Sequence, residues 1–269
     1  MARTPSLRID LADIADPAQL AEAVLALSDA TPGAATPINA IALALDILEV
    51  KRAPLRRTEG ILLTDKVRTV GSILANDCHG HEGRIRFTIA HELGHFLLEH
   101  HGLETTEGFA CTAGDMALDR GGDRHALQER EANRFAIEVL APRKRLSPVL
   151  EEDPDLRVAH RLAQDLVVSR EALLRRMVDL HSEPLAVIFA HNGRIRFAPR
   201  HPAFPWLHGV KGSPLPLMDD AEDVAGVSSG SGWIEAPPGR WCDRHPGGIF
   251  QQVHTGRDGY TTVLLWHRT

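Results

Sequence analysis

Apolar residues recur at helical spacing in six segments of the chain. Asp16-Pro17 and Thr36-Pro37 each place a capping side chain before a proline, a common start of a helix, and an apolar stripe follows each pair. The second stripe extends to Leu48. Four further helices are predicted over residues 84–101, 125–140, 156–166 and 169–180. The last two have the spacing of a helix-turn-helix, although any helical hairpin shares it.

Short apolar runs bounded by turn residues predict strands. These runs are residues 60–64, 67–76, 185–190, 194–198 and 261–266. Asn192-Gly193, between the third and fourth runs, is the strongest turn signal in the chain and predicts a β-hairpin.

The helical pattern stops near Pro184, and loops rich in proline and glycine follow it. We therefore expect an α+β protein with a domain boundary near residue 183. The larger domain is predicted over residues 1–182 and includes the helical hairpin at 156–180. A small α/β domain is predicted over residues 183–269.

The composition indicates the cellular compartment in which the protein is expected. The 269 residues are 43% hydrophobic and 25% charged, which is typical of a globular protein. No apolar run reaches the roughly 18 residues of a membrane span, and the N-terminus has no apolar signal segment, so no membrane association is expected. The chain has only three cysteines, and an odd number cannot all form pairs, so a disulfide framework is not expected. We expect a cytoplasmic protein.

The sequence His91-Glu92-Leu93-Gly94-His95 is the strongest chemical signal. On a helix, His91 and His95 are one turn apart and project from the same face, so both imidazoles can bind one Zn²⁺. Glu92, beside them, is placed to accept a proton from water, which is the role of a general base in metallopeptidases. Two histidines on an ordinary amphipathic helix are the alternative interpretation.

The third metal ligand decides the class of the site. His101 stands ten residues after His91, as in the metzincin pattern, but Leu98 occupies the position where that pattern has glycine. If the helix continues, His101 lies roughly 15 Å along its axis from His91 and cannot reach the same ion. We therefore interpret His100 and His101 as a solvated helix end.

The competing ligand is Glu129, on the helix at 125–140. Asn133 follows it by one turn, and a glutamate ligand with a polar residue one turn on is the gluzincin arrangement, in which the outer residue orients the ligands. Glu131 lies on the far side of the same helix and is expected to face solvent. A surface position for Glu129 is the alternative.

These residues carry a resemblance. Arg84-x-Arg-Phe-Thr-Ile-Ala-His-Glu-Leu-Gly-His followed by Glu129-x-x-Ala-Asn-x-Phe-Ala-x-x-x-Leu-x-Pro resembles the ImmA/IrrE family of zinc metallopeptidases, specifically over residues 70–142 and more loosely over 162–180. The chain departs from the family at Ala141-Pro142, where Met-Pro is usual. The resemblance implies a zincin-like fold of the gluzincin type.

The resemblance also implies the role of each motif residue and the kind of substrate. His91, His95 and Glu129 would bind one Zn²⁺ per chain, and Glu92 would be the catalytic base. Family members cleave a DNA-binding repressor, usually a helix-turn-helix protein encoded nearby, in response to DNA damage or a signal from a phage or other mobile element. Some carry a C-terminal GAF-like sensor domain, and residues 183–269 are expected to be one.

Cys111 lies between the two ligand-bearing segments, in the stretch 104–122 that we predict to be a loop. A thiolate passing over the metal would occupy the fourth position, displace the water and hold the enzyme latent. A small buried core cysteine is the alternative.

Residues 191–212 contain four basic residues, no acidic residue and several aromatic ones. Basic groups that follow phosphates and aromatics that stack on bases are typical of proteins that bind single-stranded nucleic acid. The candidate contacts are Arg194, Arg196, Arg200, Phe204 and Trp206, and single-stranded DNA is the candidate activator. Because the net charge is −6, such a surface would be local. A hairpin with a solvated basic face is the alternative.

Two function classes compete. The first is a site-specific zinc endopeptidase that acts on a repressor. The second is a non-proteolytic, zincin-like binding module that regulates a repressor or DNA by contact. The intact Glu92 favours the enzyme, because a pure scaffold has no need of the base.

Overall fold

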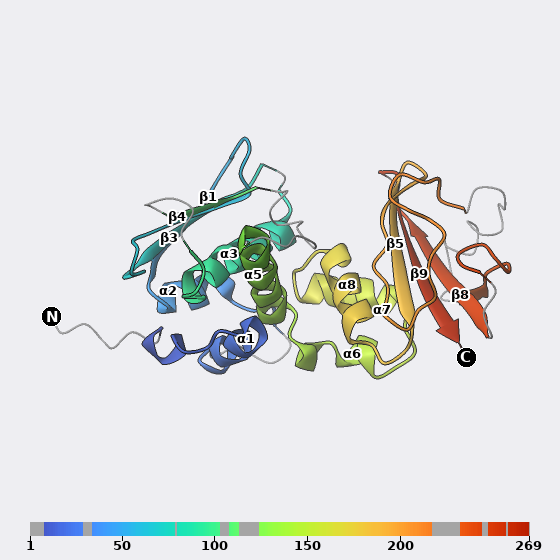
Figure 1. Ribbon diagram of the computed structural model, residues 1–269, viewed down its shortest axis with the longest axis horizontal. Helices are drawn as coiled ribbons and strands as arrows, with labels where there is room; N and C mark the ends of the chain where they lie inside the picture. Colours follow the sequence, from blue (N-terminus) through green and yellow to red (C-terminus); the bar gives the residue numbers. More distant parts are fainter. Residues whose placement is uncertain are drawn as a thin grey trace. The chain divides into compact units, whose positions relative to one another are not determined.

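The computed structural model describes residues 8–28, 34–78, 80–102, 108–112, 124–216, 232–243, 247–256 and 258–268. The chain is of the α+β class, as predicted, and packs as two compact units (Figure 1). The first consists of residues 1–142 with 164–169, and the second of residues 143–163 with 170–269. These units are defined by packing, and the predicted boundary near residue 183 stays a prediction.

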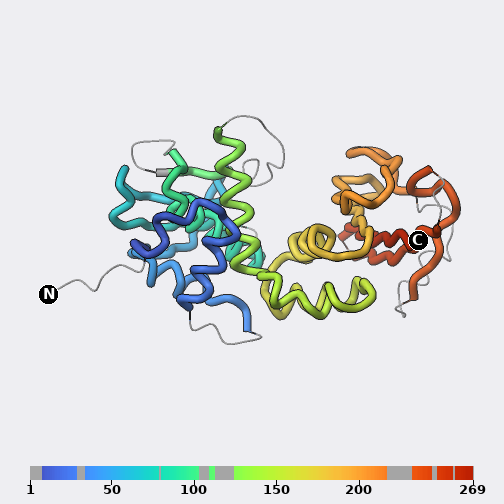
Figure 2. Tube along the Cα trace, turned by 60° about the horizontal axis from the view of Figure 1, so that its bottom comes forward, coloured from blue at the N-terminus to red at the C-terminus, as the bar shows by residue number. Residues whose placement is uncertain are grey.

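Helices of the first unit follow the apolar stripes. They are η1 (Ile9–Leu11), α1 (Pro17–Ala26), α2 (Ile38–Ala44), α3 (Glu82–Leu97) and α5 (Arg124–Leu140). Asp16 caps α1 by accepting hydrogen bonds from two backbone N–H groups, those of Ala18 and Gln19. The two views of the chain place α1 beside α5, and the two helices are in contact (Figure 2).

Two predicted helices end earlier than expected. The chain leaves α2 at Leu45, and Asp46 adopts a left-handed φ of 65°, after which a strand begins. The helix predicted to reach His101 ends at Leu97, because Leu98 turns to an extended conformation with ψ 90°. The change of direction at Leu98 brings His101 back toward α3.

Four strands form the sheet of the first unit. They are β1 (Ile47–Ala53), β2 (Gly60–Thr64), β3 (Gly71–Asn76) and β4 (Gly108–Cys111), in the order β1-β3-β2-β4. β1 runs parallel to β3, and β2 runs antiparallel to both β3 and β4. β3 was expected to begin at Val67 and β4 to be loop. The predicted loop at 104–122 otherwise lies outside the described residues.

Helix α3 packs against β2 and β3 and, on its other side, against α5 (Figure 1). A side chain at Gly94 would place its Cβ only 3.3 Å from the Cα of Ala132, so glycine permits this close approach. Phe96 and Phe135 are fully buried in the same region. The close packing of these two helices places the functional side chains of one against those of the other.

The second unit combines short helices with an antiparallel sheet. The helical elements are η2 (Arg143–Arg145), α6 (Ser147–Leu150), most of α7 (Leu156–Asp165) and α8 (Arg170–Leu180). The strands are β5 (Leu185–His191), β6 (Arg194–Phe197), β7 (Ile234–Glu235), β8 (Gly248–Thr255) and β9 (Tyr260–Arg268), in the order β6-β5-β9-β8-β7. The predicted hairpin at Asn192-Gly193 is confirmed, because both residues have the positive φ of a tight turn, 49° and 70°.

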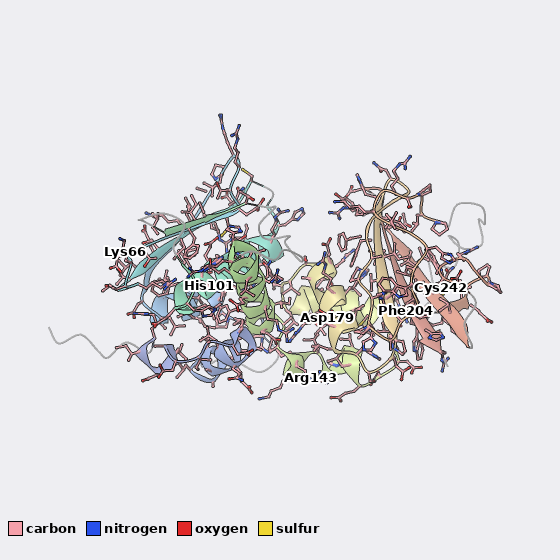
Figure 3. All side chains as sticks on the ribbon, viewed as in Figure 1. Lys66, His101, Arg143, Asp179, Phe204 and Cys242 are labelled. Atoms are coloured by element: carbon pink, nitrogen blue, oxygen red, sulfur yellow. The ribbon has the colours of Figure 1, made fainter. Side chains whose placement is uncertain are left out.

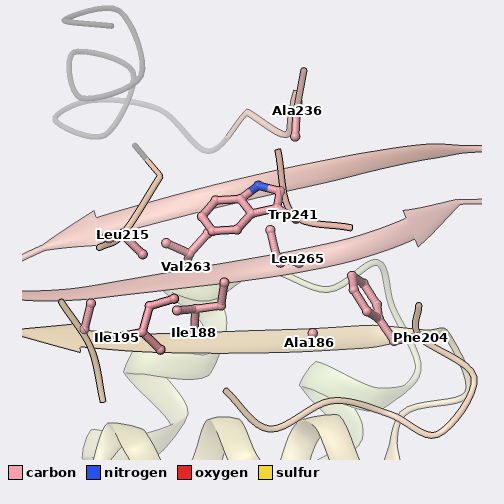
Figure 4. Packing of buried hydrophobic residues seen from close by; sticks show 10 residues of the cluster. Ala186, Ile188, Ile195, Phe204, Leu215, Ala236, Trp241, Val263 and Leu265 are labelled. Atoms are coloured by element: carbon pink, nitrogen blue, oxygen red, sulfur yellow. The ribbon is translucent and has the colours of Figure 1, made fainter. Parts of the chain in front are cut away.

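A hydrophobic cluster covers one face of this second sheet (Figure 4). Alternate residues of β5, Ala186 and Ile188, face the cluster, and α8 packs against β5. Trp241 and Phe204 pack into it from the segments outside the sheet. Within the described part of the chain, no helix has the length and the apolar composition that a bilayer span requires.

Candidate metal centre

Helix α3 presents two fully buried imidazoles to the same point. His91 and His95 are one helical turn apart, and their Nε2 atoms lie 3.1 Å from each other. The ring planes are nearly perpendicular, with centroids 4.7 Å apart. Phe109 of β4 stacks on His95 with ring centroids 4.4 Å apart. Both nitrogens are therefore aimed at one small volume.

Glu129 of α5 completes a three-donor cluster. Its Oε2 lies 3.3 Å from Nε2 of His91, and its Oε1 lies 3.1 Å from Nε2 of His95. A tetrahedral zinc ion with bonds of about 2.0–2.1 Å separates its nitrogen and oxygen ligands by about 3.3–3.4 Å. The spacing and the chemistry of these donors therefore fit one zinc ion.

Asn133, one turn after Glu129, contacts the outer nitrogen of the first histidine. Its Oδ1 lies 3.0 Å from Nδ1 of His91. An amide oxygen accepts a proton there, so the hydrogen of His91 belongs on Nδ1 and the lone pair of Nε2 faces the cluster. This contact is compatible with the orienting role expected for Asn133, which stays a prediction.

Burial and mutual charge set the protonation of the cluster. Burial opposes the ionisation of Glu129, but hydrogen bonds with His91 and His95 outweigh it, so the pKa of Glu129 lies well below its ordinary value. Burial lowers the pKa of His95 to about 4, although the contact with Glu129 opposes the shift. An ionised carboxylate beside a neutral imidazole is the form that binds a metal.

Glu92 follows His91 on the same helix and is fully buried. Gly60 of β2 lies directly against its carboxylate: a Cβ at position 60 would be 2.9 Å from Cδ of Glu92 and 2.7 Å from Cγ2 of Thr88. Arg84 of α3 forms a two-point ion pair with Glu59, at 2.8 and 3.0 Å, which ties β2 to α3 at this place. The strand therefore bounds the space in which the Glu92 carboxylate lies.

Residues 57–178 match the family described as Peptidase_M78: IrrE N-terminal-like domain. This segment of the chain is similar to the IrrE N-terminal-like family. No curated protein matches the sequence. Among solved structures, a Mycobacterium tuberculosis transcriptional regulator is similar, with 16% identity, a TM-score of 0.54 and coverage of 96% of this chain and 78% of that one.

The matched residues contain the whole cluster, from Gly60 to Asn133. The resemblance stated from the two motifs is therefore confirmed for the IrrE N-terminal-like domain, and the fold agrees with a zincin-like α+β domain. The similarity to the mycobacterial regulator, at its low identity, supports the fold only. The GAF-like character of residues 183–269 stays a prediction.

His101 was expected in a solvated helix end, and this expectation is wrong. The side chain is only 2% exposed, and its Nδ1 lies 3.0 Å from Nδ1 of His95. Figure 3 shows His101 close to the ribbons of α3 and α5 in the first unit. It contacts the outer nitrogen of His95 and not the Nε2 that faces Glu129, so the geometry favours Glu129 over His101 as the third ligand. Glu131, expected to face solvent, contacts Nε2 of His101 at 3.0 Å.

Cys111 stands at the end of the edge strand β4, opposite Gly60 of β2, in the IrrE N-terminal-like domain. It is buried, and its Sγ lies 4.0 Å from Oε1 of Glu129. The donor atoms of His91, His95, Cys111 and Glu129 all lie within 4.8 Å of one another. A thiolate and a carboxylate oxygen on one zinc would be about 3.5 Å apart. The sulfur is thus close to a ligand position without occupying it.

The predicted nucleic-acid residues lie outside this domain and do not form one surface. Phe204 is 2% exposed in the core of the second sheet, so the predicted base contact of Phe204 does not fit the structure. Arg200 lies 3.8 Å over the ring of Trp206, which is 79% exposed, and also donates a hydrogen bond to the carbonyl of Phe204. Arg194 donates to the carbonyl of Gly212.

Arg196 has partners of its own. It lies 3.5 Å from Glu171 of α8 and packs over the rings of Phe197 and Tyr260. An acidic partner reduces the value of this arginine for binding phosphate. The exposed stack of Arg200 on Trp206 is therefore what the structure retains of the predicted basic and aromatic surface.

Sequence reasoning missed three contributors to the site. Gly60 and Arg84 carried no chemical signal of their own, although Arg84 belongs to the resemblance motif. His101 carried a signal, its histidine side chain near the motif, but the helix was assumed to continue through it.

Proposed function

We propose that the chain is a zinc-dependent endopeptidase that acts in the cytoplasm and cleaves a DNA-binding transcriptional repressor. The observation that carries the proposal is the buried cluster of His91, His95 and Glu129, at separations of 3.1–3.3 Å, with Glu92 beside it. The match of residues 57–178 to a peptidase family supports it.

The position of each side chain in the site indicates its proposed role in catalysis. A bound zinc ion would make water acidic and polarise the scissile carbonyl. His91, His95 and Glu129 would hold that ion, and Asn133 orients the ring of His91. Glu92 would accept the proton of the attacking water and pass it to the leaving amine. Its buried position removes competing water from the carboxylate.

The kind of substrate is inferred from similar proteins. The resemblance to ImmA/IrrE peptidases points to a helix-turn-helix repressor encoded nearby, and a DNA-damage or mobile-element signal would start cleavage. The similar mycobacterial structure is a transcriptional regulator, which fits this role.

Cys111 would keep the peptidase latent. Its sulfur lies 4.0 Å from Oε1 of Glu129, and a small rotation about its side-chain bonds would bring a thiolate to a ligand position. Four protein ligands close a zinc site and leave no place for water. Single-stranded DNA bound near Arg200 and Trp206 would be the activating ligand.

One observation favours a second candidate, the non-proteolytic regulatory module. All four donor side chains are at most 1% exposed, as in structural zinc sites that do not turn over substrate. In that case the metal would stabilise a domain that binds a repressor or DNA by contact, and Glu92 would have no chemical task.

The test compares the wild type with Cys111→Ala and Glu92→Gln. Each protein, loaded with zinc, is incubated with a cell extract of the source organism in which the gene for this protein has been deleted. New protein N-termini in the extract are then identified by mass spectrometry. We expect new N-termini in one or a few DNA-binding proteins, strongest with Cys111→Ala and absent with Glu92→Gln. Identical profiles for all three proteins would contradict peptidase activity and favour the regulatory module.

A further inference from the structure

A chain of three polar side chains extends outward from the proposed metal site. His95 Nδ1 lies 3.0 Å from His101 Nδ1, and His101 Nε2 lies 3.0 Å from Oε2 of Glu131. We propose that His101, oriented by Glu131, is a positioning residue that fixes the proton of His95 on Nδ1 and so directs the Nε2 lone pair of His95 toward the metal. The inference rests on the proposed zinc site.

The position of His101 is held from two sides. The side chain is buried, and its carbonyl oxygen accepts a hydrogen bond from the guanidinium of Arg68. The same guanidinium donates to the carbonyl of Glu99 at 3.0 Å. Arg68 is itself only 6% exposed and therefore anchors the chain just after α3. The imidazole of His101 is thus placed by the fold and does not sample the solvent.

The protons on His95 and His101 have one arrangement that satisfies both hydrogen bonds. A neutral His95 that binds metal through Nε2 carries its hydrogen on Nδ1. This hydrogen needs an acceptor, and the atom opposite it is Nδ1 of His101. A neutral His101 that accepts at Nδ1 carries its own hydrogen on Nε2, where it donates to the carboxylate of Glu131. Each donor then meets one acceptor.

A competing interpretation is a second metal site. One nitrogen each of His100 and His101 and one oxygen of Glu131 lie within 4.8 Å of one another. A metal on Nε2 of His101 would leave the hydrogen of a neutral ring on Nδ1, facing the Nδ1 hydrogen of His95 at a nitrogen separation of 3.0 Å. Two donors would then oppose each other. Zinc at His95 and a second ion at His101 are therefore incompatible, and the orienting role is favoured.

The test measures the zinc dissociation constant by competition with a chromophoric chelator, together with the unfolding temperature of the metal-free protein. His101→Leu removes the acceptor and should weaken zinc binding by about 10- to 100-fold. His101→Gln offers an amide oxygen to His95 and should recover much of that loss. A purely structural role predicts the opposite order, because leucine suits a buried position better than glutamine.

Two further variants keep the test decisive. Glu131→Ala changes a partly exposed side chain, so it should fold, and we expect zinc binding weakened by about 10-fold. His100→Ala is the matched control: His100 also contacts Glu131, at 2.8 Å, and no contact joins it to His95 among the described residues. The zinc affinity of His100→Ala should stay within about threefold of the wild type, because an outer residue affects the metal through its contact with a ligand, and His100 has no such contact with His95 in the described part of the chain.

The outcomes separate the inference from the function on which it rests. Unchanged zinc affinity in His101→Leu and Glu131→Ala, with normal binding by the wild type, overturns the orienting role alone. A second zinc ion that His100→Ala removes assigns these residues to a second metal site and also overturns it. A wild type that binds no zinc overturns both this inference and the proposed peptidase.

Discussion

Gly60 of strand β2 lies against the carboxylate of Glu92, with no room for a side chain between them. A Cβ at position 60 would come within 2.9 Å of Cδ of Glu92 and 2.7 Å of Cγ2 of Thr88. The glycine therefore sets the position of the proposed base without any chemistry of its own.

Gly60→Ala should displace the Glu92 carboxylate and lower the rate of cleavage by at least about tenfold, because a general base acts only within hydrogen-bond reach of its proton. Zinc content should stay normal, since the heavy atoms nearest to the new methyl group belong to Glu92 and Thr88 and not to the three proposed ligands. Gly232→Ala is the control, because a Cβ at Gly232 meets no described residue within 4 Å. Equal rates for both variants would show that Gly60 does not position the base.

Glu92→Gln should keep the metal and lose cleavage by at least about 10²-fold, because it removes the proton acceptor and leaves both imidazoles in place. Single-turnover cleavage of the identified substrate and metal analysis of the same sample provide the two measurements. Near-normal turnover would mean that another group is the base.

Cys111→Ala should raise basal cleavage and remove the sulfur-to-metal absorption of the cobalt-substituted protein, because the thiolate would no longer occupy the fourth position. Cys78→Ala is the matched control, since Cys78 is exposed and its sulfur contacts the carbonyl of Leu55. A wild-type cobalt spectrum without a sulfur band would make Cys111 a core residue.

Trp206→Ala should weaken the binding of an oligothymidine by about 1–3 kcal/mol, the usual contribution of one base stacked on an aromatic ring. Fluorescence anisotropy at several salt concentrations measures this, and Val210→Ala provides an exposed control on the neighbouring segment. If the wild type does not bind the oligonucleotide, single-stranded DNA is not the activator.

The two halves of the proposed metal cluster could be predicted because helical geometry sets each half, whereas their meeting depends on the packing of α3 against α5. The four-residue spacings of His91 with His95 and of Glu129 with Asn133 each describe one turn, and no distant contact is needed to place them on one face. The capped start of α1 at Asp16 and the hairpin at Asn192-Gly193 were predictable for the same reason: each depends on the conformation of two or three neighbouring residues.

The errors came from positions that tertiary contacts decide. His101 returns to His95 because the chain leaves the helix at Leu98 and Arg68, 33 positions earlier, binds its carbonyl oxygen. β4 is only four residues long and depends on pairing with β2. Phe204 is buried by a cluster assembled from separate segments, which no local pattern reveals.

Zinc content tests the central claim, that His91, His95 and Glu129 bind one catalytic ion. Glu129→Ala and Glu138→Ala are each made in the Cys111→Ala background, so that the thiolate cannot replace a lost ligand. They are purified with zinc present beside the wild type, dialysed and analysed by inductively coupled plasma mass spectrometry. Glu138 shares the helix with Glu129 but pairs with Arg134. We predict about one zinc per chain in the wild type and in Glu138→Ala, and almost none in Glu129→Ala, because two imidazoles without a third ligand hold zinc poorly. Zinc retained at full content by Glu129→Ala, or absent from the wild type, would contradict the account.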